Sequence, residues 1–325
     1  MSENTVNLAS LGSLLVKVGD YLEGISTTTG LLYDPPARYA EQLKSIRSHE
    51  EYELAYTEPD PLVTIRVSSY KGSKLLIERC IPSILAQTHQ NFEVIIVGDD
   101  DPDGPIIESH LEKLGDNRFA FYQREYRGPY PDDPRQAWLI SGAHAFNTAS
   151  RLSKGLWISK LDQDDAWEPN HLHDLLEHGR KNRSEIVYGS TRCHFQDDAG
   201  RPSVVVGEFP PKKGSFALTA SLSHGSFKIF EMNELAYLWS DPGDWGLAWR
   251  LWLAGAKFNF LDEPIANVYI TPKKNLGYYE YQYQMLLDIV EKMSNQSPVQ
   301  RKVTRLEAKL KTLIFRILYF VKKRS

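Results

Sequence analysis

The pattern of apolar and polar positions changes along the chain. From residue 62 onward, short runs of β-branched and apolar residues alternate with longer stretches in which apolar residues recur every three to four positions. The runs at 63–68, 92–97 and 156–161 predict strands, and 119–122 predicts a weaker one. The longer stretches, such as 136–153, predict helices. Strands that alternate with helices indicate an α/β fold, with a mostly parallel sheet of the Rossmann type flanked by helices.

This pattern divides the chain into four parts. Residues before 61 show a mild helical period that Pro35 and Pro36 interrupt, and we interpret them as an N-terminal extension. The strand and helix alternation that follows predicts one large domain with two halves. The parts are an N-terminal extension, the two halves of the domain and a C-terminal helical tail, at residues 1–60, 61–180, 181–275 and 276–325.

The last 25 residues differ from the rest of the chain in charge. They contain nine lysines and arginines against one glutamate, whereas the whole protein has a net charge of −4. Apolar residues recur every three to four positions from Val303 to Ile317, which predicts a basic amphipathic helix. Such a helix either binds the anionic surface of a membrane or packs its apolar side on the domain. The pattern does not distinguish these two roles.

Composition narrows the class of protein. The net charge of −4 gives no reason to expect a nucleic-acid partner. Cys80 and Cys193 are too few for a disulfide framework and lack the spacing of a metal site, which favours a reducing compartment. The first residues lack the features of a signal peptide, and no stretch reaches about 18 unbroken apolar residues. We therefore expect a cytoplasmic protein, peripheral on the inner face of the cytoplasmic membrane if the tail binds lipid.

Polar residues follow three of the predicted strands. They occupy 68–72 after the first strand, 98–101 after the second and 162–165 after the last. Ligands of parallel sheets bind beyond the carboxyl ends of the strands, so we expect these three segments at one edge. Asp-x-Asp pairs occur elsewhere in this chain and mean little alone. Asp162 and Asp164 differ from the other pairs because they directly follow a buried apolar strand.

The pair Asp162 and Asp164 predicts a metal site. Carboxylates suit Mn²⁺ or Mg²⁺, which bridge to phosphate oxygens. The alternative is an acidic turn that caps a helix beginning near Pro169. The chain contains neither G-x-x-x-x-G-K-[ST] nor G-x-G-x-x-G. We therefore expect metal and side chains to hold any nucleotide, which disfavours kinases and dehydrogenases.

Four further groups of residues occur in a recognisable order. They are Val67-Ser-Ser-Tyr70 with 84–97, then Leu161-Asp-Gln-Asp-Asp-Ala-Trp-Glu-Pro169, then Gly243-Asp244-Trp245 with 249–258, and finally Asp262-Glu-Pro264 with Tyr269-Ile-Thr271. Together they resemble the GT-A-fold, family-2-type inverting glycosyltransferases. The resemblance covers roughly two thirds of the chain.

The resemblance implies roles for individual residues. It implies nucleotide binding by Ser68, Tyr70, Asp99, Asp100, Asn147 and Asp162, metal binding by Asp164 and Asp162, and general-base catalysis by Asp244, with His224, Trp245 and Arg250 as weaker candidates for accessory contacts with the acceptor. Tyr70 would stack on the base. Asp99 would accept a hydrogen bond from the base N3–H, unless Asp100 takes that role.

Each of these assignments has a structural alternative. Tyr70 would otherwise be an exposed loop aromatic, and Asp99 a turn residue. Asp244 is also placed to be the N-cap of a helix at 245–254. Trp245 lies at helical spacing with later tryptophans, which is typical of core residues, and a lone histidine such as His224 is most often structural.

One departure from the family concerns the diphosphate. Phe146 stands where the family often has an arginine near the diphosphate. The metal, together with Arg118, Arg124 or Lys160, would then neutralise the phosphates. The sequence does not choose among these three cations.

The resemblance and the strand-end residues predict a metal-dependent inverting glycosyltransferase. It would move a sugar from a nucleotide diphosphate-sugar, with UDP- or dTDP-sugars favoured, to a glycan or lipid-linked acceptor in cell-surface polysaccharide synthesis. Residues 61–180 would bind the donor and 181–275 the acceptor. Two alternatives stay open: a nucleotidyltransferase, although 67–72 lacks a Gly-rich loop, and a non-catalytic scaffold of the same fold in glycan assembly or at a membrane.

Overall fold

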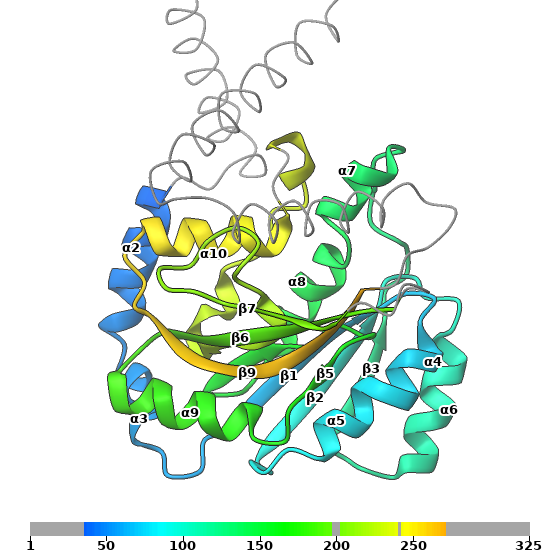
Figure 1. The fold of residues 1–325 in the computed structure, drawn as a ribbon, viewed down its shortest axis with the longest axis horizontal. Helices are drawn as coiled ribbons and strands as arrows, with labels where there is room; N and C mark the ends of the chain where they lie inside the picture. Colours follow the sequence, from blue (N-terminus) through cyan, green and yellow to red (C-terminus); the bar gives the residue numbers. More distant parts are fainter. Residues whose placement is uncertain (1–35, 197–201, 240–241, 271–325) are drawn as a thin grey trace, which may run out of the picture.

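The computed structural model describes residues 36–196, 202–239 and 242–270 (Figure 1). The predicted C-terminal tail at 276–325 and the first 35 residues of the predicted extension lie outside the described residues. The described part of the chain forms a nine-stranded sheet in the order β3-β2-β1-β4-β8-β6-β9-β5, with β7 paired to β6. None of the described helices is both long and apolar enough to cross a membrane.

The strands fall into a parallel and a mixed half. They are β1 (Val63–Ser69), β2 (Phe92–Gly98), β3 (Phe119–Gln123), β4 (Trp157–Lys160), β5 (Ala166–Trp167), β6 (Ile186–Phe195), β7 (Val204–Val206), β8 (Ser221–His224) and β9 (Phe258–Ile270). Strands β3, β2, β1 and β4 are all parallel. Strand β8 runs antiparallel to β4 and β6, whereas β9 is parallel to β6. The predicted α/β class is confirmed.

Helices cover both faces of this sheet (Figure 1). The longer ones are α2 (Pro36–Arg47), α6 (Gly104–Leu114), α7 (Pro134–Leu139), α8 (Ala143–Leu152), α9 (His171–Asn182) and α10 (Gly243–Leu253). The shorter ones are η1 (Glu50–Glu53), α3 (Leu54–Thr57), α4 (Ser73–Leu75), η2 (Leu76–Cys80), α5 (Ile81–Leu85), η3 (Leu218–Ala220), η4 (Gly225–Ile229) and η5 (Ala236–Trp239).

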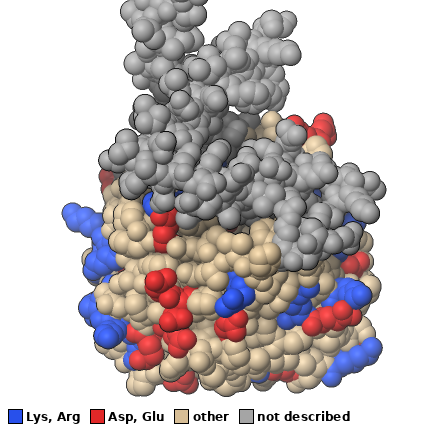
Figure 2. Space-filling model, viewed as in Figure 1, with Lys and Arg blue, Asp and Glu red and all other residues tan. Residues whose placement is uncertain are grey.

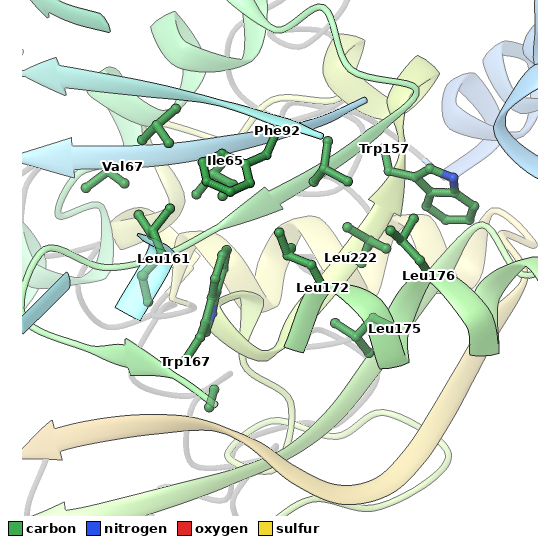
Figure 3. Close-up of a cluster of buried hydrophobic side chains, with 14 of the residues drawn as sticks. Ile65, Val67, Phe92, Trp157, Leu161, Trp167, Leu172, Leu175, Leu176 and Leu222 are labelled. Carbon is green, nitrogen blue, oxygen red and sulfur yellow. The ribbon is translucent and has the colours of Figure 1, made fainter. Parts of the chain in front are cut away.

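Each face of the sheet has its own buried apolar cluster. On one face, Ile65 and Val67 of β1 pack in a cluster with Leu172 and Leu175 of α9 (Figure 3). On the other face, the cluster joins α2, α8 and α10 through Tyr39, Leu43, Phe146, Leu247 and Leu251. Strands that are buried on both faces read as near-continuous apolar runs, which explains the pattern at 92–97. Strand β1 is equally buried but includes the polar residues Thr64 and Arg66.

Two helical segments are interrupted, one at a glycine with positive φ and one at a proline. The predicted helix at 136–153 is two helices, α7 and α8, because Gly142 between them has φ +72°. The helix after β1 begins at Ser73, passes through the π-helical turn η2 and restarts as α5 with Pro82 in its first turn. Proline lacks the N–H that a continuous α-helix needs, so this restart follows from the sequence.

The buried carboxylate Glu185 joins the N-terminal helices to the sheet. It is 0% exposed and accepts hydrogen bonds from Arg47 Nε and Nη2 at 2.7 Å each, from the Tyr52 hydroxyl at 2.7 Å and from the Lys257 N–H at 2.8 Å. Burial raises the pKa of Glu185, but these donors outweigh burial and hold the pKa below its ordinary value. Residues 36–57, which the sequence pattern assigned to an extension, therefore pack as part of the folded domain.

The visible surface carries charges of both signs. Figure 2 shows lysine and arginine side chains interspersed with aspartates and glutamates over the part of this face that the structure describes. Mixed charge of this kind is typical of the ordinary surface of a globular protein.

Candidate functional site

The parallel strands bring three polar loops together. In the sheet β2 and β4 both pair with β1, so the loops after all three strands begin at the same edge. Ser69 at the end of β1 lies opposite Gly98 at the end of β2, and Lys160 at the end of β4 pairs with Arg66. The predicted convergence of the three strand ends is therefore confirmed, and its cause is the register of the parallel half.

The three carboxylates of the aspartate loop, residues 162–165, differ in how deeply they are buried. Asp165 is buried, accepts a hydrogen bond from the Tyr269 N–H at 3.1 Å, and has a pKa raised well above its ordinary value by burial and by Asp164 and Asp162. Asp162 and Asp164 are half-buried. Asp162 accepts a hydrogen bond from Lys160, whereas the main-chain oxygen of Asp164 accepts one from Arg79 at 2.6 Å. Asp165 thus supports the loop, and the other two carboxylates remain closer to solvent.

Gln163 connects the aspartate loop to the loop after β1. Its Oε1 accepts the Tyr70 N–H at 3.0 Å, and its Nε2 donates to the Tyr70 carbonyl at 3.0 Å. The amide therefore pairs with both main-chain groups of Tyr70 as a neighbouring strand would. A Cβ on Gly72 would meet the Gln163 side chain at 2.5 Å, so the glycine leaves room for this bridge. Tyr70 and the aspartate loop consequently form one unit.

The loop after β2 contains three aspartates in different positions. Asp99 is 2% exposed and accepts hydrogen bonds from the Arg124 guanidinium and from the Tyr130 hydroxyl, the latter at 2.5 Å. Asp100 is exposed and has φ +52°. Asp101 is buried and accepts from the Ser69 hydroxyl and from the Lys71 N–H at 2.8 Å. Asp101 therefore fixes the β1 and β2 loops to each other, and Asp99 holds the residues after β3.

Ser68 lies on the same edge and contacts Gly142, the residue just before α8. Its hydroxyl donates to the carbonyl of Gly142 at 3.1 Å. A Cβ on Gly142 would meet the Ser68 Cβ at 3.3 Å, so the glycine allows close approach as well as the positive φ. This contact places the turn between α7 and α8 beside the predicted base pocket.

Asp244 lies in the first turn of α10, facing the charges of the aspartate loop. The helix begins at Gly243 with Pro242 as its N-cap, so Asp244 is not the N-cap that the sequence allowed. Its carboxylate accepts the Trp245 N–H at 2.7 Å. Burial raises the pKa of Asp244, with Lys160 acting against this and Asp162 adding to it.

Lys160 is the cation between these carboxylates. It is 9% exposed. Burial lowers its pKa, but the charges of Asp162, Asp244 and Asp165 outweigh burial and raise it. The ammonium group therefore stays charged, and it connects Asp244 electrostatically with the aspartate loop.

The structure also separates the three cations that the sequence left open for the diphosphate. Arg118 lies just before β3, near the opposite end of that strand, and pairs with Asp116 at 2.6 Å. Arg124 follows β3 at the site edge and pairs with Asp99. Lys160 lies beside the aspartate loop. Arg118 is thus excluded as a diphosphate contact, and Lys160 is the best placed.

Four predicted site residues have structural contacts that occupy them. Asn147 is 1% exposed, and its amide donates to the Met232 carbonyl at 3.0 Å and accepts the Met232 N–H at 2.9 Å. His224 is stacked on Tyr52 at 4.5 Å and pairs with Trp157, the first residue of β4, away from the site edge. The predicted acceptor contact of His224 is therefore wrong, because the ring is part of the core. For Asn147 the geometry favours support of the loop at 232 over contact with a nucleotide.

The remaining two predicted acceptor contacts lie on α10. Arg250 is buried, donates to the Glu231 carbonyl at 2.9 Å and lies over the Tyr39 ring, which indicates a packing role. Trp245 is half-buried, packs against the α10 core cluster and stacks on Trp249 at 5.6 Å. Because Trp249 is 38% exposed, this stacked pair continues to the surface next to Asp244.

The aspartate loop fits a small donor set for a divalent cation. Among the residues that the structure describes, no group of three or more His, Cys, Asp and Glu side chains is placed to hold a metal ion. Magnesium-type sites commonly use one or two carboxylates, with substrate phosphates and water completing the shell. Asp162 and Asp164 match that requirement in type and exposure.

Residues 141–233 match the family described as Glycosyl transferase family 2. This segment of the chain is similar to family 2 glycosyltransferases. The matched segment includes the aspartate loop, whereas Tyr70 and Asp244 lie outside it.

Two named glycosyltransferases are similar to parts of this chain. Glycosyltransferase GlyG of Streptococcus pneumoniae serotype 4 is 28% identical over 149 residues, 45% of this chain and 44% of that protein. UDP-Glc:alpha-D-GlcNAc-diphosphoundecaprenol beta-1,3-glucosyltransferase WfgD of Escherichia coli is 30% identical over 131 residues, 40% of this chain and 46% of that protein. The matches thus span less than half the length of these two relatives.

A solved structure supports the fold. The mannosyltransferase PcManGT of Pyrobaculum calidifontis, in complex with GDP-Man and Mn²⁺, superposes with a TM-score of 0.51 at 14% identity, over 81% of this chain and 72% of that one. Together with the family match, this confirms the predicted GT-A-type fold and the resemblance to family 2 glycosyltransferases.

Sequence reasoning missed three residues of the site, Gln163, Arg127 and Tyr130, and named Arg124 only as one of three candidate cations for the diphosphate. Gln163 stands between two aspartates that drew attention for their charge. Arg127 and Tyr130 follow β3, whose carboxyl end lies on the same edge as those of β1, β2 and β4. Applying the strand-end rule to this weaker third strand would have found them.

Proposed function

We propose that this protein is a metal-dependent inverting glycosyltransferase. It transfers a sugar from a nucleotide diphosphate-sugar to a hydroxyl of a glycan or lipid-linked acceptor in polysaccharide synthesis. The observation that carries the proposal is the arrangement at one sheet edge: Tyr70 is fixed to the aspartate loop by Gln163, and Lys160 links that loop electrostatically to Asp244. This arrangement supplies an aromatic face for a base, carboxylates for a metal–diphosphate and a separate carboxylate for proton transfer.

The donor class is inferred from the site and from similar proteins. An aromatic ring beside half-buried carboxylates suits a nucleoside diphosphate with a divalent cation. The printed name of WfgD specifies a UDP-sugar donor and a lipid diphosphate acceptor, and PcManGT was solved with GDP-Man and Mn²⁺. We favour UDP- or dTDP-sugars for this chain.

The reaction proposed for this geometry is a single displacement. The acceptor oxygen attacks the anomeric carbon, its proton passes to Asp244, and the bond from the anomeric carbon to the phosphate oxygen breaks with its electron pair leaving on the diphosphate. Asp244 suits general-base catalysis because burial raises its pKa and so makes it a stronger base. Lys160 keeps a positive charge near the leaving group. Mn²⁺ or Mg²⁺ held by Asp162 and Asp164 would add charge stabilisation of the diphosphate.

The acceptor would lie on the α10 side of Asp244. The stacked pair Trp245 and Trp249 reaches the surface there, and aromatic faces are common platforms for apolar faces of ligands. An acceptor hydroxyl that approaches along this pair would arrive at the Asp244 carboxylate.

Turnover of a panel of UDP-, dTDP- and GDP-sugars with Mn²⁺ tests the proposal. We expect one donor class to be hydrolysed slowly without acceptor. Replacing Asp244 by Asn should lower kcat by about 10²- to 10⁴-fold, the usual contribution of a general base, with little change in the Kd for the nucleotide. Asp60→Asn is the matched control, because Asp60 is exposed and lies before β1, away from the site edge. The proposal is wrong if no nucleotide sugar is bound or turned over, or if both variants behave alike.

The basic C-terminal segment supports one further part of the proposal, a peripheral position on the cytoplasmic face of a membrane. Its charge and periodicity come from the sequence alone. Sedimentation with anionic vesicles, comparing the full chain with one ending at Gln300, tests it. Equal binding of both proteins would contradict a membrane role for the segment.

A further inference from the structure

The ring of Tyr70, which is expected to stack on a nucleobase, has an arginine over one face. The guanidinium carbon of Arg127 lies 3.9 Å from the Tyr70 ring centroid and 4.4 Å from the Tyr130 ring centroid. Both distances are well inside the range of cation–π contact, so the planar guanidinium is held against two aromatic rings. Arg127 Nε also lies 4.0 Å from Asp99 Oδ2.

The residues on either side of Arg127 are firmly held. Arg124 pairs with Asp99, and its N–H donates to the Gly98 carbonyl at 3.0 Å. Gly128 lies so close to His144 that a Cβ there would approach the ring to 2.0 Å. Tyr130 binds Asp99 at 2.5 Å and packs edge-on against His144. The backbone of this loop is therefore anchored before and after Arg127.

The Arg127 side chain itself is held weakly by comparison. It is 43% exposed, and it faces Asp99 only at 4.0 Å. Both oxygens of Asp99 already accept hydrogen bonds from Arg124 and Tyr130. The side chain can consequently swing away from the rings without disturbing the anchored backbone.

The location of the covered ring identifies what Arg127 competes with. Tyr70 is fixed to the aspartate loop by the two hydrogen bonds of Gln163. A base stacked on Tyr70 would thus have its diphosphate within reach of Asp162 and Asp164. A flat guanidinium and a flat base bind the same kind of ring face, so the two cannot occupy this face together.

We propose that Arg127 occupies the nucleobase position of the donor site and leaves it when a nucleotide binds. Arg127 is then a determinant of nucleotide affinity that acts by competition. Asp99 contributes by organising Arg124 and Tyr130 around the pocket. This inference rests on the proposed function, since it needs a nucleotide at Tyr70.

Competition predicts a gain in affinity when Arg127 is removed. The apparent Kd of a ligand equals its intrinsic Kd divided by the fraction of protein with an open site. The cation–π contacts of an exposed arginine are worth a factor of about two to five in that fraction. Arg127→Ala should therefore bind the nucleotide about two- to fivefold more tightly than the wild type.

Calorimetric titration of the full chain with UDP, dTDP and GDP in the presence of Mn²⁺ tests this. Arg127→Ala should lower the Kd, and Arg127→Trp should raise it, because an indole fills the slot without leaving it easily. Arg118→Ala is the matched control: its guanidinium also lies over an aromatic ring, Phe92 at 4.1 Å, but near the opposite end of β3. Its Kd should equal that of the wild type.

The outcomes separate this inference from the proposed function. If the wild type and all variants bind none of the three nucleotides, the proposed function fails. If the wild type binds one of them and Arg127→Ala binds it equally well or more weakly, only the competition fails. Loss of affinity in both Arg127 variants would show that the arginine contacts the bound nucleotide instead. Thermal unfolding of each variant confirms that the protein is folded.

Discussion

The bridge between Gln163 and Tyr70 gives the sharpest test of how the site is assembled. Gln163→Leu keeps most of the side-chain volume but removes two hydrogen bonds, each 3.0 Å long, to the main chain of Tyr70. A typical intramolecular hydrogen bond contributes about 0.5–1.5 kcal/mol net. Tyr70 and Gln163 are half-buried, so water replaces part of the loss. We therefore expect the free energy of unfolding to fall by about 1–2 kcal/mol.

Nucleotide binding should suffer together with stability. Without the bridge, the loop after β1 must lose conformational freedom when the base binds to Tyr70. The free energy of nucleotide binding should therefore become less favourable by the same amount. A loss of 1–2 kcal/mol corresponds to roughly a 5- to 30-fold rise in Kd. Urea unfolding at fixed protein concentration measures the first quantity, and calorimetry with UDP and Mn²⁺ measures the second. The slope of the unfolding free energy against urea should not change.

Gln90→Leu is the matched control for this prediction. The Gln90 amide also makes two hydrogen bonds, to the Gln87 carbonyl and from Arg118, but it lies just before β2, at the opposite edge of the sheet. It should lose similar stability and keep the wild-type Kd. If the two variants raise the Kd equally, or if Gln163→Leu leaves it unchanged, the bridge does not form part of the binding site.

Three other outcomes follow from the charged groups. Glu185→Ala leaves Arg47 without its buried partner and should lower the free energy of unfolding by about 3–5 kcal/mol in urea. Because the folded-state pKa of Glu185 is depressed, part of this difference between wild type and variant depends on pH: it is complete above the ordinary pKa of about 4.3 and is lost as the pH falls through the lower folded-state pKa. Lys160→Met removes the cation that lowers the pKa of Asp244, so the acid limb of the kcat–pH profile should move to higher pH; an unmoved limb would contradict the coupling. Asp164→Asn should raise the Mn²⁺ concentration needed for half-maximal turnover at least tenfold, the lower end of what metal-site changes cost, and an unchanged titration would remove Asp164 from the metal site.

The parallel half of the fold was predictable because its signal is local. The run at 63–68 is rich in β-branched residues and the run at 92–97 is nearly all apolar, and each is long enough to be read without its partners. Once these strands are parallel, the strand-end rule places 68–72, 98–101 and 162–165 at one edge without any knowledge of contacts. Tyr70 and the aspartate loop could therefore be brought together from the sequence.

The mixed half was harder because its strands do not show a clean pattern. Strand β9 is 13 residues long and contains Asp262 and Glu263 near a register shift against β6, between Gly189 and Thr191. An irregular pairing interrupts the alternation on which strand prediction depends. Strand β8 has only four residues, Ser221–His224, of which three are polar.

The missed site residues share a different physical cause. Arg127 and Tyr130 lie in a loop without periodicity, and their roles arise only from Asp99 and Tyr70, more than 20 residues earlier in the chain. His224 was misjudged for the opposite reason. The sequence does not indicate whether a histidine ring will be stacked in the core. His224 lies there because β8 pairs with the start of β4.

The anchoring of α2 has a consequence for the order in which the protein assembles during synthesis. Arg47 binds Glu185 and the Gly255 carbonyl, 138 and 208 positions later, and Tyr39 packs on Phe230 at 4.7 Å. This helix leaves the ribosome long before its partners exist. Its apolar side chains must therefore wait, exposed or bound by a chaperone, until α10 and the start of β9 have been made. Helix α2 is the first described helix to be translated, but it is among the last to pack against its partners.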